Sequence, residues 1–495
     1  LRDVLISGTV TTSSGDIEVY GANLTVNGNM TTTGAGQPIK LKASGTIYSP
    51  SSVAFKTNGG NAIFWADSDI SGSGRIKLQH NNNITTTNTS YTTAGATGGG
   101  RVILAGGAGS TDGSEPTGFA VSTEAESGIW LGAQSQAMTI WSGGGDIVIN
   151  GKVNYAAAAY AGVAMWPHLA INSGNGKISI NGQAVGTVGR GFETMWGENG
   201  NMRLISNGGT ATDPAITIVG TTQSTVDVGL KVYWSVAANN NLIEATGAGG
   251  ISITGSAPTN STYYAVELPG TGILSKSGPI VVDGGAKGVR LNGAAAYYGE
   301  RAVVLGYCQL TVCADSLVTG SSTADIKIIG DTVITPAAAA NLAINTSGAL
   351  AIEPKGSAFA GDTTWNSNSS GISGLRVGKD SGATAQTYRT MLAGNQTVAG
   401  PIEVFGGEVA VCGDVRSTAG TAGMLFKGSG NVIVPGPGST YINGNTAQVV
   451  CPAAVSGTTS SNFFTNGTPI TFWSDADNSG AGVVGIFNGA NINTH

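Results

Sequence analysis

A short phrase recurs along this chain and constrains its fold more than any other feature. It reads glycine, any residue, isoleucine, any residue, isoleucine or valine, any residue, glycine. It starts at Gly15, Gly145, Gly176, Gly249, Gly278 and Gly400. Apolar residues at alternate positions place two side chains on one face of a β-strand, and the flanking glycines permit the positive φ of a sharp corner. The phrase therefore predicts many short strands that end in corners.

Looser versions of the phrase fill the gaps between these strands. They occur at residues 24–26, 39–41, 76–78, 216–218 and 326–328. A β-sandwich needs longer strands and tight hairpins, whereas these runs hold two or three inward residues and are followed by loops of irregular length. Stacked turns also account for the many Asn and Thr residues, which can form ladders along the stack. We therefore predict an all-β right-handed parallel β-helix (β-solenoid), an elongated rod with roughly 20 to 30 residues per turn.

A second, larger repeat links the two ends of the chain. Residues 15–86 resemble residues 400–494. Corresponding residues are at first 385 positions apart, as Ile17 and Ile402 are, and after an insertion in the second copy they are 408 positions apart, as Phe64 and Phe472 are. Such self-similarity is typical of repeat architectures. We expect residues 1–495 to form a single continuous β-solenoid, a fragment or subunit of a longer repetitive fibre. Its continuation should resemble the stretch that follows the first copy, including residues 98–104.

These motifs resemble those of the giant filamentous-haemagglutinin-like and autotransporter-like surface proteins of bacteria. The resemblance rests on the glycine-bounded strands and on the Phe-Trp-x-Asp-x-Asp phrases at residues 64–69 and 472–477. In the first copy that phrase is followed by residues 75–78 and 98–106. The resemblance implies a right-handed parallel β-helix, export to the cell surface, and a role in adhesion, aggregation or biofilm formation.

The charge balance excludes some partners. Lys and Arg number 23 and Asp and Glu number 29, a net charge of −6 with no basic run, so nothing drives binding to nucleic acid or to an anionic membrane. No apolar stretch approaches the 18 residues of a membrane-spanning helix. A weakly acidic surface rich in Thr and Asn is typical of extracellular proteins.

We therefore expect a secreted bacterial cell-surface protein, structural or adhesive, that mediates adhesion, aggregation or formation of a matrix or filament. Its expected partners are further copies, met end to end or laterally, and a glycan or host-surface receptor. Two alternatives remain: a subunit that assembles head to tail into filaments, and a β-helix enzyme that acts on glycans.

No residue is assigned a catalytic, cofactor-binding or metal-binding role. Acidic residues are interpreted as charges scattered through loops, namely Glu115, Glu124, Glu126, Glu193 and Glu198. A glycosidase needs two carboxylates a few ångströms apart, and no spacing in the sequence predicts such a pair. Arg101, Arg190 and His168 have no nucleophile motif nearby. We therefore assign no enzymatic activity and no cofactor.

Two phrases, Asp67-x-Asp69-x-Ser-Gly and Asp475-x-Asp477-x-Ser-Gly, resemble the start of a calcium-binding loop. Both lack the distal bidentate Glu of that motif, so a plain turn that closes a strand is the favoured interpretation. Calcium stays as the alternative.

The four cysteines form no zinc motif, because no Cys-x-x-Cys spacing occurs and the chain has only three histidines, His80, His168 and His495. Either of two pairs could join neighbouring turns as a disulfide in an exported chain, Cys308 with Cys313 or Cys412 with Cys451. Four small buried thiols are the alternative.

The eight tryptophans allow two interpretations, exposed platforms for sugar rings or buried corner fillers. They are Trp65, Trp130, Trp141, Trp166, Trp196, Trp234, Trp365 and Trp473. Burial is favoured, because Trp65 and Trp473 sit inside strand-like runs.

Overall fold

The computed structural model describes most of the chain. The described residues are 1–87, 96–134, 136–195, 201–233, 241–292, 302–309, 313, 315–382, 384–435, 440–443, 447–451, 461–480, 482–486 and 490–494. They contain no α-helix, and short 3-10 turns lie at Gly285–Lys287 and Ala339–Asn341. The prediction of an all-β chain is confirmed.

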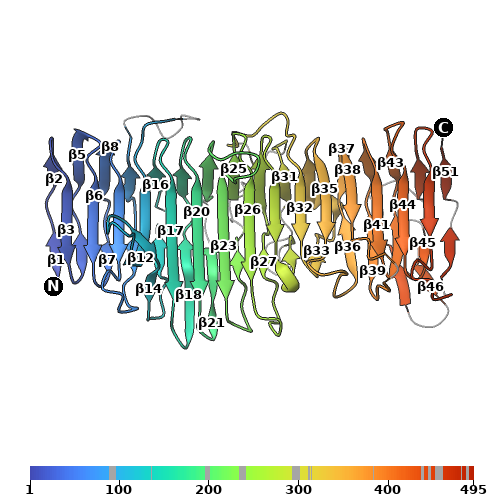
Figure 1. Ribbon diagram of the computed structural model, residues 1–495, viewed down its shortest axis with the longest axis horizontal. Coiled ribbons are helices and arrows are strands. Elements are labelled where there is room, and N and C mark those ends of the chain that lie inside the picture. The colour runs from blue at the N-terminus through green and yellow to red at the C-terminus, as the bar shows by residue number, and fades with distance from the viewer. Residues whose placement is uncertain are drawn as a thin grey trace. The chain divides into compact units, whose positions relative to one another are not determined.

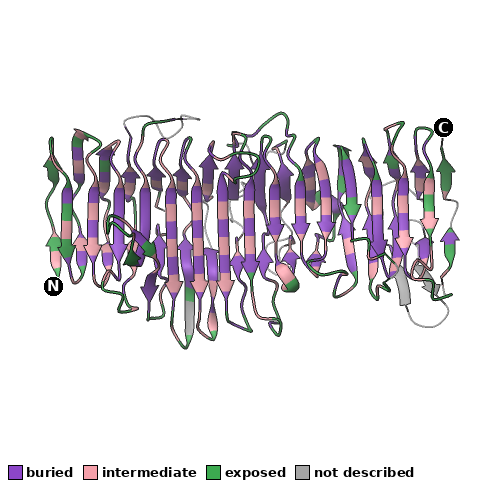
Figure 2. Cartoon of the chain, in the orientation of Figure 1, coloured by how far each residue is buried: buried purple, intermediate pink, exposed green. Residues whose placement is uncertain are grey.

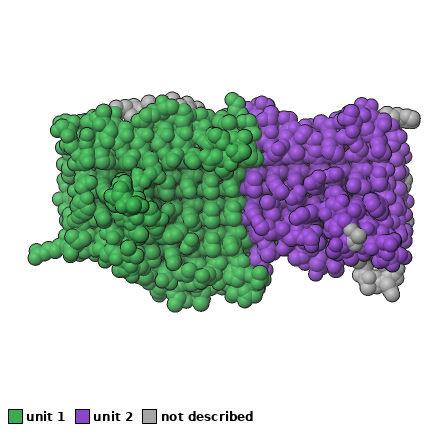
Figure 3. All heavy atoms as spheres, viewed as in Figure 1, with its two compact units in different colours: residues 1–267, 271–279, 310–318 green, residues 268–270, 280–309, 319–495 purple. Residues whose placement is uncertain are grey.

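The chain divides into two compact units (Figure 3). Unit 1 comprises residues 1–267, 271–279 and 310–318, and unit 2 comprises residues 268–270, 280–309 and 319–495. In each unit the chain visits three parallel sheets in turn, called A, B and C below, so each unit is a parallel β-helix (Figure 1).

In unit 1, sheet A contains β1 (Val4–Ile6), β4 (Leu24–Val26), β7 (Ile47–Ser49), β10 (Ile76–Leu78), β15 (Ile129–Leu131), β18 (Ala158–Met165), β21 (Val188–Thr194), β24 (Leu230–Lys231) and β27 (Val266–Glu267). Sheet B contains β2 (Val10–Thr12), β5 (Met30–Ala35), β8 (Ala54–Asn58), β11 (Asn83–Thr85), β16 (Met138–Trp141), β19 (Leu169–Asn172), β22 (Arg203–Ser206), β25 (Asn241–Ala245) and β28 (Thr271–Ser275). Sheet C contains β3 (Ile17–Gly21), β6 (Ile39–Ala43), β9 (Ala62–Ala66), β12 (Val102–Gly109), β17 (Ile147–Val153), β20 (Ile178–Ala184), β23 (Ile216–Thr222) and β26 (Ile251–Ser256). Two inserted strands, β13 (Pro116–Gly118) and β14 (Ala120–Ser122), pair with β12 and β17.

In unit 2, sheet A contains β30 (Val289–Arg290), β33 (Val333–Ile334), β36 (Thr363–Asn366), β39 (Arg389–Ala393), β42 (Glu408–Cys412), β45 (Val432–Val434) and β50 (Val484–Ile486). Sheet B contains β31 (Val303–Gly306), β34 (Leu342–Asn345), β37 (Asn368–Ile372), β40 (Gln396–Val398), β43 (Val415–Ser417), β48 (Asn462–Phe464) and β51 (Asn491–Asn493). Sheet C contains β29 (Ile280–Asp283), β32 (Ile326–Ile329), β35 (Ala349–Glu353), β38 (Gly374–Val377), β41 (Ile402–Gly406), β44 (Met424–Gly428) and β49 (Ile470–Trp473). A separate hairpin joins β46 (Thr440–Asn443) to β47 (Ala447–Val450).

The six strict phrases of the sequence all form strands of sheet C. Their apolar residues face the core, and buried and partly exposed residues alternate along these strands (Figure 2). None of the flanking glycines has a positive φ, so the predicted reason for them is wrong. They allow close stacking instead: a Cβ on Gly176 would lie 2.1 Å from the carbonyl oxygen of Gly145, and one on Gly145 would lie 2.2 Å from that of Gly100.

The length of each coil varies more than the sequence predicted. Partners on sheet C lie 22 residues apart at Ile17 and Ile39 but 45 apart at Val102 and Ile147. Insertions such as β13 and β14 lengthen single coils while the stacked strands stay in register.

An amide ladder runs along five coils of unit 2. Asn395 N–H donates to Asn368 Oδ1 at 3.0 Å, and Asp414 N–H donates to Asn395 Oδ1 at 3.2 Å. Asn462 Nδ2 then donates to Asp414 Oδ1 at 2.8 Å, and Asn491 Nδ2 to Asn462 Oδ1 at 2.9 Å. The prediction that stacked polar side chains form ladders is confirmed here.

The two copies of the large repeat share one core arrangement. In the first copy (residues 15–86) the rings of Phe55 and Phe64 meet edge to face, with centroids 5.0 Å apart. In the second copy (residues 400–494) Phe463 and Phe472 do the same at 5.4 Å. The residue correspondence seen in the sequence is therefore a structural one.

Candidate functional site

The outer face of sheet A in unit 1 carries a group of aromatic and charged side chains. Strand register aligns one outward residue from each of seven neighbouring strands. These are Tyr48, Lys77, Trp130, Ala164, Glu193, Lys231 and Glu267. We call this row the sheet A row.

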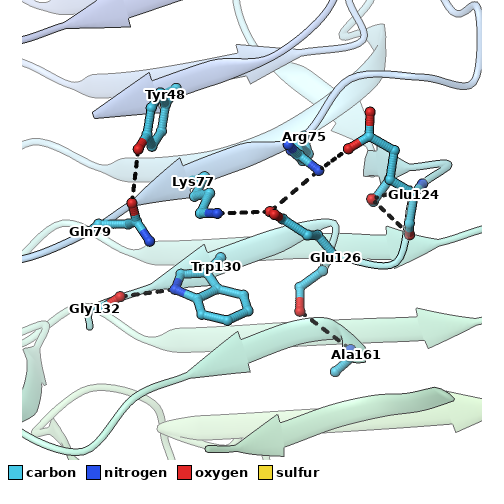
Figure 4. Close-up of polar contacts among 11 residues, drawn as sticks. Tyr48, Arg75, Lys77, Gln79, Glu124, Glu126, Trp130, Gly132 and Ala161 are labelled. Carbon is cyan, nitrogen blue, oxygen red and sulfur yellow. Dashed lines mark hydrogen bonds and ion pairs between the residues drawn. The ribbon is translucent and has the colours of Figure 1, made fainter. Parts of the chain in front are cut away.

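One end of the row is held together by ion pairs between coils (Figure 4). The Glu126 carboxylate lies between two cations, 2.9 Å from Lys77 Nζ and 3.3 Å from Arg75 NH1. Arg75 also pairs with the exposed Glu124 at 2.6 Å. Lys77 Nζ lies 5.3 Å from the ring centroid of Trp130, within the range of a cation–π contact.

Trp130 is the centre of an aromatic group. Its Nε1–H donates to the carbonyl of Gly132 at 3.0 Å, so the polar edge of the indole is satisfied (Figure 4). Tyr160 packs edge to face on it at 5.2 Å, and Trp166 lies 5.7 Å away. Tyr160 is 42% exposed, so part of this group faces solvent.

The other end of the row is a buried ionic cluster. Arg190 bridges Glu193 at 2.6 Å and Asp227 at 2.8 Å. Lys231 Nζ pairs with Glu267 at 3.1 Å and lies 4.4 Å from the ring centroid of Tyr233. The three carboxylates of this cluster are buried.

Burial changes the acidity of this cluster. Loss of hydration raises the pKa of Glu193, and the positive charge of Arg190 offsets part of that rise. For Asp227 too, loss of hydration raises the pKa, and the positive charge of Arg190 offsets part of that rise. Both carboxyl groups therefore hold a proton more readily than they would in water.

The interpretation of the acidic residues as scattered loop charges is wrong for Glu193, which lies within β21 and is buried. Glu115, Glu124 and Glu126 are ion-paired, Glu115 with Arg101. Glu198 lies outside the described residues. The sequence carries one usable signal, the opposite charge of Arg190 three positions before Glu193.

Asp227, Lys231 and Glu267 were missed by sequence reasoning. They meet Glu193 only through strand register across coils of unequal length, and no local motif marks them.

The loops at Asp67 and Asp475 are closed by their own hydrogen bonds. Asp67 Oδ1 accepts from the Gly72 N–H at 2.9 Å and from the Ser71 hydroxyl at 3.0 Å. Asp475 Oδ1 accepts from Gly480 and Ser479 at the same two distances. The bonds of Asp67 and Asp475 are those of a plain turn. Among the described residues no group of three or more His, Cys, Asp or Glu side chains could hold a metal ion.

The cysteines are all disulfide-bonded. Cys412 of β42 is joined to Cys451, just after β47, so this bond fixes the inserted hairpin to sheet A. The alternative of four buried thiols is wrong. His80 and His168 lie at turn positions with φ of 55° and 67°, and His495 lies outside the described residues.

The expectation that the tryptophans are buried is confirmed for Trp65, Trp130, Trp141 and Trp365. Trp166 is only partly buried. The expectation is wrong for Trp473, which faces outward from β49 and is 49% exposed. Trp196 and Trp234 lie outside the described residues.

No protein-family model, curated protein or solved structure matches this chain significantly. The β-solenoid fold stands on the chain's own structure, and the family resemblance on its motifs alone. In the part of the chain that the structure describes, no helix has the length and apolar character needed to cross a membrane.

Proposed function

We propose that this protein is an extracellular structural and adhesive fibre protein of bacterial cell surfaces, of the filamentous-haemagglutinin-like or autotransporter-like kind. The sheet A row carries the proposal. Its charged side chains pair between neighbouring coils, and the Trp130 ring lies beside Lys77, with the partly exposed Tyr160 packed on it.

The ion pairs support a structural role, because they join consecutive turns of the solenoid. Ion pairs between neighbouring coils also occur in unit 2, on sheet C and on sheet A. There Lys327 pairs with Glu353 at 2.8 Å, and Arg389 with Glu408 at 2.6 Å. A solenoid is stabilised by contacts between neighbouring turns, so such pairs stabilise the stack against unfolding.

The disulfides support export. Stable disulfide bonds form in oxidising compartments such as the periplasm and the cell exterior, and are rare in the cytosol. A chain whose four cysteines are all paired fits that setting.

The aromatic group supports adhesion. Tyr and Trp side chains combine an apolar ring with a polar group and are enriched at recognition surfaces. Tyr160, packed on Trp130, offers such a surface to a glycan or host-surface receptor. Association between copies would give the aggregation or matrix formation expected of such a fibre.

Beads coated with the purified protein test the proposal. They should adhere to cultured epithelial cells and to one another more than albumin-coated beads do. Tyr160→Ser should reduce adhesion several-fold, and Tyr388→Ser, at an equally exposed tyrosine in unit 2, should leave it unchanged. Equal adhesion of protein-coated and albumin-coated beads would refute the adhesive role.

A second candidate function, cleavage of glycans, is favoured by the buried cluster. A carboxyl group with a raised pKa next to a second carboxyl is a usual source of a general acid. Release of reducing sugar ends from acidic polysaccharides, abolished by Glu193→Gln, would establish it. Absence of product over a broad substrate panel would leave the cluster a structural role.

A further inference from the structure

A groove of about 440 Å³ lies on the outer face of sheet A in unit 2, between the coils of β33 and β36. Small-molecule sites usually have volumes of about 300–1,000 Å³ and mostly apolar walls with a few polar groups. The groove has this composition. Its lining includes three apolar and three polar residues, namely Ile334, Pro336 and Ala337 from the coil of β33 and Asp362, Thr364 and Asn366 from the coil of β36.

The groove lies where the pairing of two neighbouring strands is interrupted. β33 and β36 pair at Ile334 and Thr364, whereas β36 and β39 pair along the whole of β36. Pro336, which follows β33, has no N–H to donate to a ladder. A side chain joins the two coils here instead, because Asn366 Nδ2 donates to the carbonyl of Ala337 at 2.6 Å. The local sequence therefore accounts for the opening between the coils.

A carboxylate marks one end of the groove. The side chain of Asp362 is 62% exposed. Its Oδ1 accepts the N–H of Arg389 at 2.9 Å, and its Oδ2 lies 3.7 Å from a nitrogen of the Arg389 guanidinium. Glu408 holds that guanidinium more closely, with its Oε1 2.6 Å from Nε. Asp362 can therefore accept hydrogen bonds from a second cation.

The opposite end of the groove is closed by an amide. Asn366 is only 5% exposed, and its Nδ2 is bonded to two carbonyls of the β33 coil. Asp362 and Asn366 are four positions apart along an extended strand, so the groove is about 13 Å long. Between them lie Thr364 and the apolar side chains of Ile334 and Pro336. This arrangement suits a short apolar body with a polar group at one end.

We propose that this groove binds small primary amines with an apolar body about the size of a hexyl chain. The ammonium group donates charge-assisted hydrogen bonds to the carboxylate of Asp362. The methylene chain lies against Ile334, Pro336 and Ala337 and is removed from water there. The charge of Asp362 and the net charge of −6 disfavour an anion of the same shape. The groove shares no residue with the sheet A row, so the proposal goes beyond the adhesive function.

Methyl NMR of the full chain with ¹³C-labelled isoleucine tests the proposal. The δ1-methyl signal of Ile334, assigned with Ile334→Val, should shift saturably on addition of hexylammonium. Hexanol has the same apolar body without the charge and should bind about two- to fivefold more weakly, the change expected for one exposed ion pair. Hexanoate should bind more weakly still. The amide of Nα-acetyl-lysine, whose ammonium is attached to peptide groups, should bind more weakly than hexylammonium.

A matched pair of variants tests the role of the carboxylate. Asp362→Asn should weaken hexylammonium binding to the level of hexanol and leave hexanol binding unchanged, because the amide oxygen can still accept the Arg389 N–H. Asp325 is the control, since its Oδ1 accepts the N–H of Ala349 on the next coil at 2.8 Å, outside the groove. Asp325→Asn should leave both affinities unchanged. Thr364→Phe, which fills the groove, should abolish the shift with both ligands, and the isoleucine methyl signals of unit 1 check that each variant is folded.

Several outcomes would overturn the proposal. They are the absence of a saturable shift at Ile334, hexanoate binding as tight as that of hexylammonium, and undiminished binding by Asp362→Asn or Thr364→Phe. Tighter binding of the acetyl-lysine amide would make a lysine side chain of another protein the ligand, and the choice of a small free amine would be wrong. Beads coated with Asp362→Asn should adhere like those coated with the natural chain, so the groove and the adhesive function can fail separately.

Discussion

The two copies of the large repeat share a core and differ in what covers it. The next coil, β12, covers the indole of Trp65, which is 2% exposed, whereas Trp473, next to the corresponding aromatic pair, is 49% exposed. The second copy also carries an insertion between β45 and β48, where the first copy has only a short loop between β7 and β8. The core of one coil is thus encoded locally, while burial of its residues depends on the neighbouring coil.

The largest difference between the two copies is expected in the loss of stability when a core phenylalanine is replaced. Phe64→Ala should lower the free energy of unfolding by about 3–5 kcal/mol, because this ring is fully buried between coils. Phe472→Ala should cost less than half of that, since its ring is partly exposed above Phe426. Hydrogen exchange of β9 and β49, measured with urea unfolding, compares the two. Equal losses would contradict the view that burial of the ring sets the size of the effect.

The second largest effect is expected when the disulfide between Cys412 and Cys451, which lies in the second copy, is removed. Replacing Cys412 and Cys451 together by alanine removes a cross-link over 39 positions, worth about 2–4 kcal/mol. Alanine suits the site, because both cysteines lie in an apolar cluster with Met391 and Ile433.

The loss should be local. Exchange protection should fall in β42 and β47 and stay unchanged in the first copy, where Asn27 stands at the position of Cys412. A fall in protection across the whole chain would contradict the view that each coil depends chiefly on its neighbours.

The closed turns should give a smaller effect. Asp67→Ala removes hydrogen bonds to a buried carboxylate and leaves alanine at φ 48°, so a loss of about 1–3 kcal/mol is expected. Asp67→Asn should retain most of the stability, because its amide oxygen can accept the same bonds. Thermal unfolding measures both variants. Because these bonds already satisfy Asp67, a chelator should leave the natural chain unchanged, and destabilisation by the chelator would revive the calcium alternative.

Replacing Trp65 or Trp473 should change the stability by smaller amounts, which should still differ between the two copies. Trp65→Phe loses the hydrogen bond to Gly107 and should cost about 1 kcal/mol, whereas Trp473→Phe should be nearly neutral. Acrylamide should quench the fluorescence of Trp473 and spare that of Trp65, each assigned by its phenylalanine variant. Equal quenching would remove the basis of the comparison.

The sequence was sufficient to predict strands, stacking and the large repeat, because each depends on local alternation of apolar residues and on the glycines beside the strands, although these glycines serve close stacking and not the predicted positive-φ corners. It was not sufficient to predict the register of unequal coils, and so it missed the meeting of Glu193 with Asp227 on the outer face of sheet A. It also could not distinguish Trp65 from Trp473, since both lie in the same motif and differ only in the strand above them.

The smallest expected effect is a titration confined to the first copy. Tyr20 donates a hydrogen bond to Glu18 at 2.6 Å, and this bond, with burial and the nearby negative charge, raises the pKa of Tyr20 to about 12. The second copy has the buried Phe405 at the equivalent position, so it carries no such phenol. Because the folded pKa exceeds that of an unfolded tyrosine, about 10, the interaction favours folding below pH 10, and its contribution is lost as the pH rises through 12. In ¹³C NMR of labelled tyrosine rings, with Tyr20→Phe for assignment, Tyr20 should titrate near pH 12 in the natural chain and nearer pH 10 in Glu18→Gln. If Glu18→Gln left the midpoint unchanged, the hydrogen bond would not be its cause.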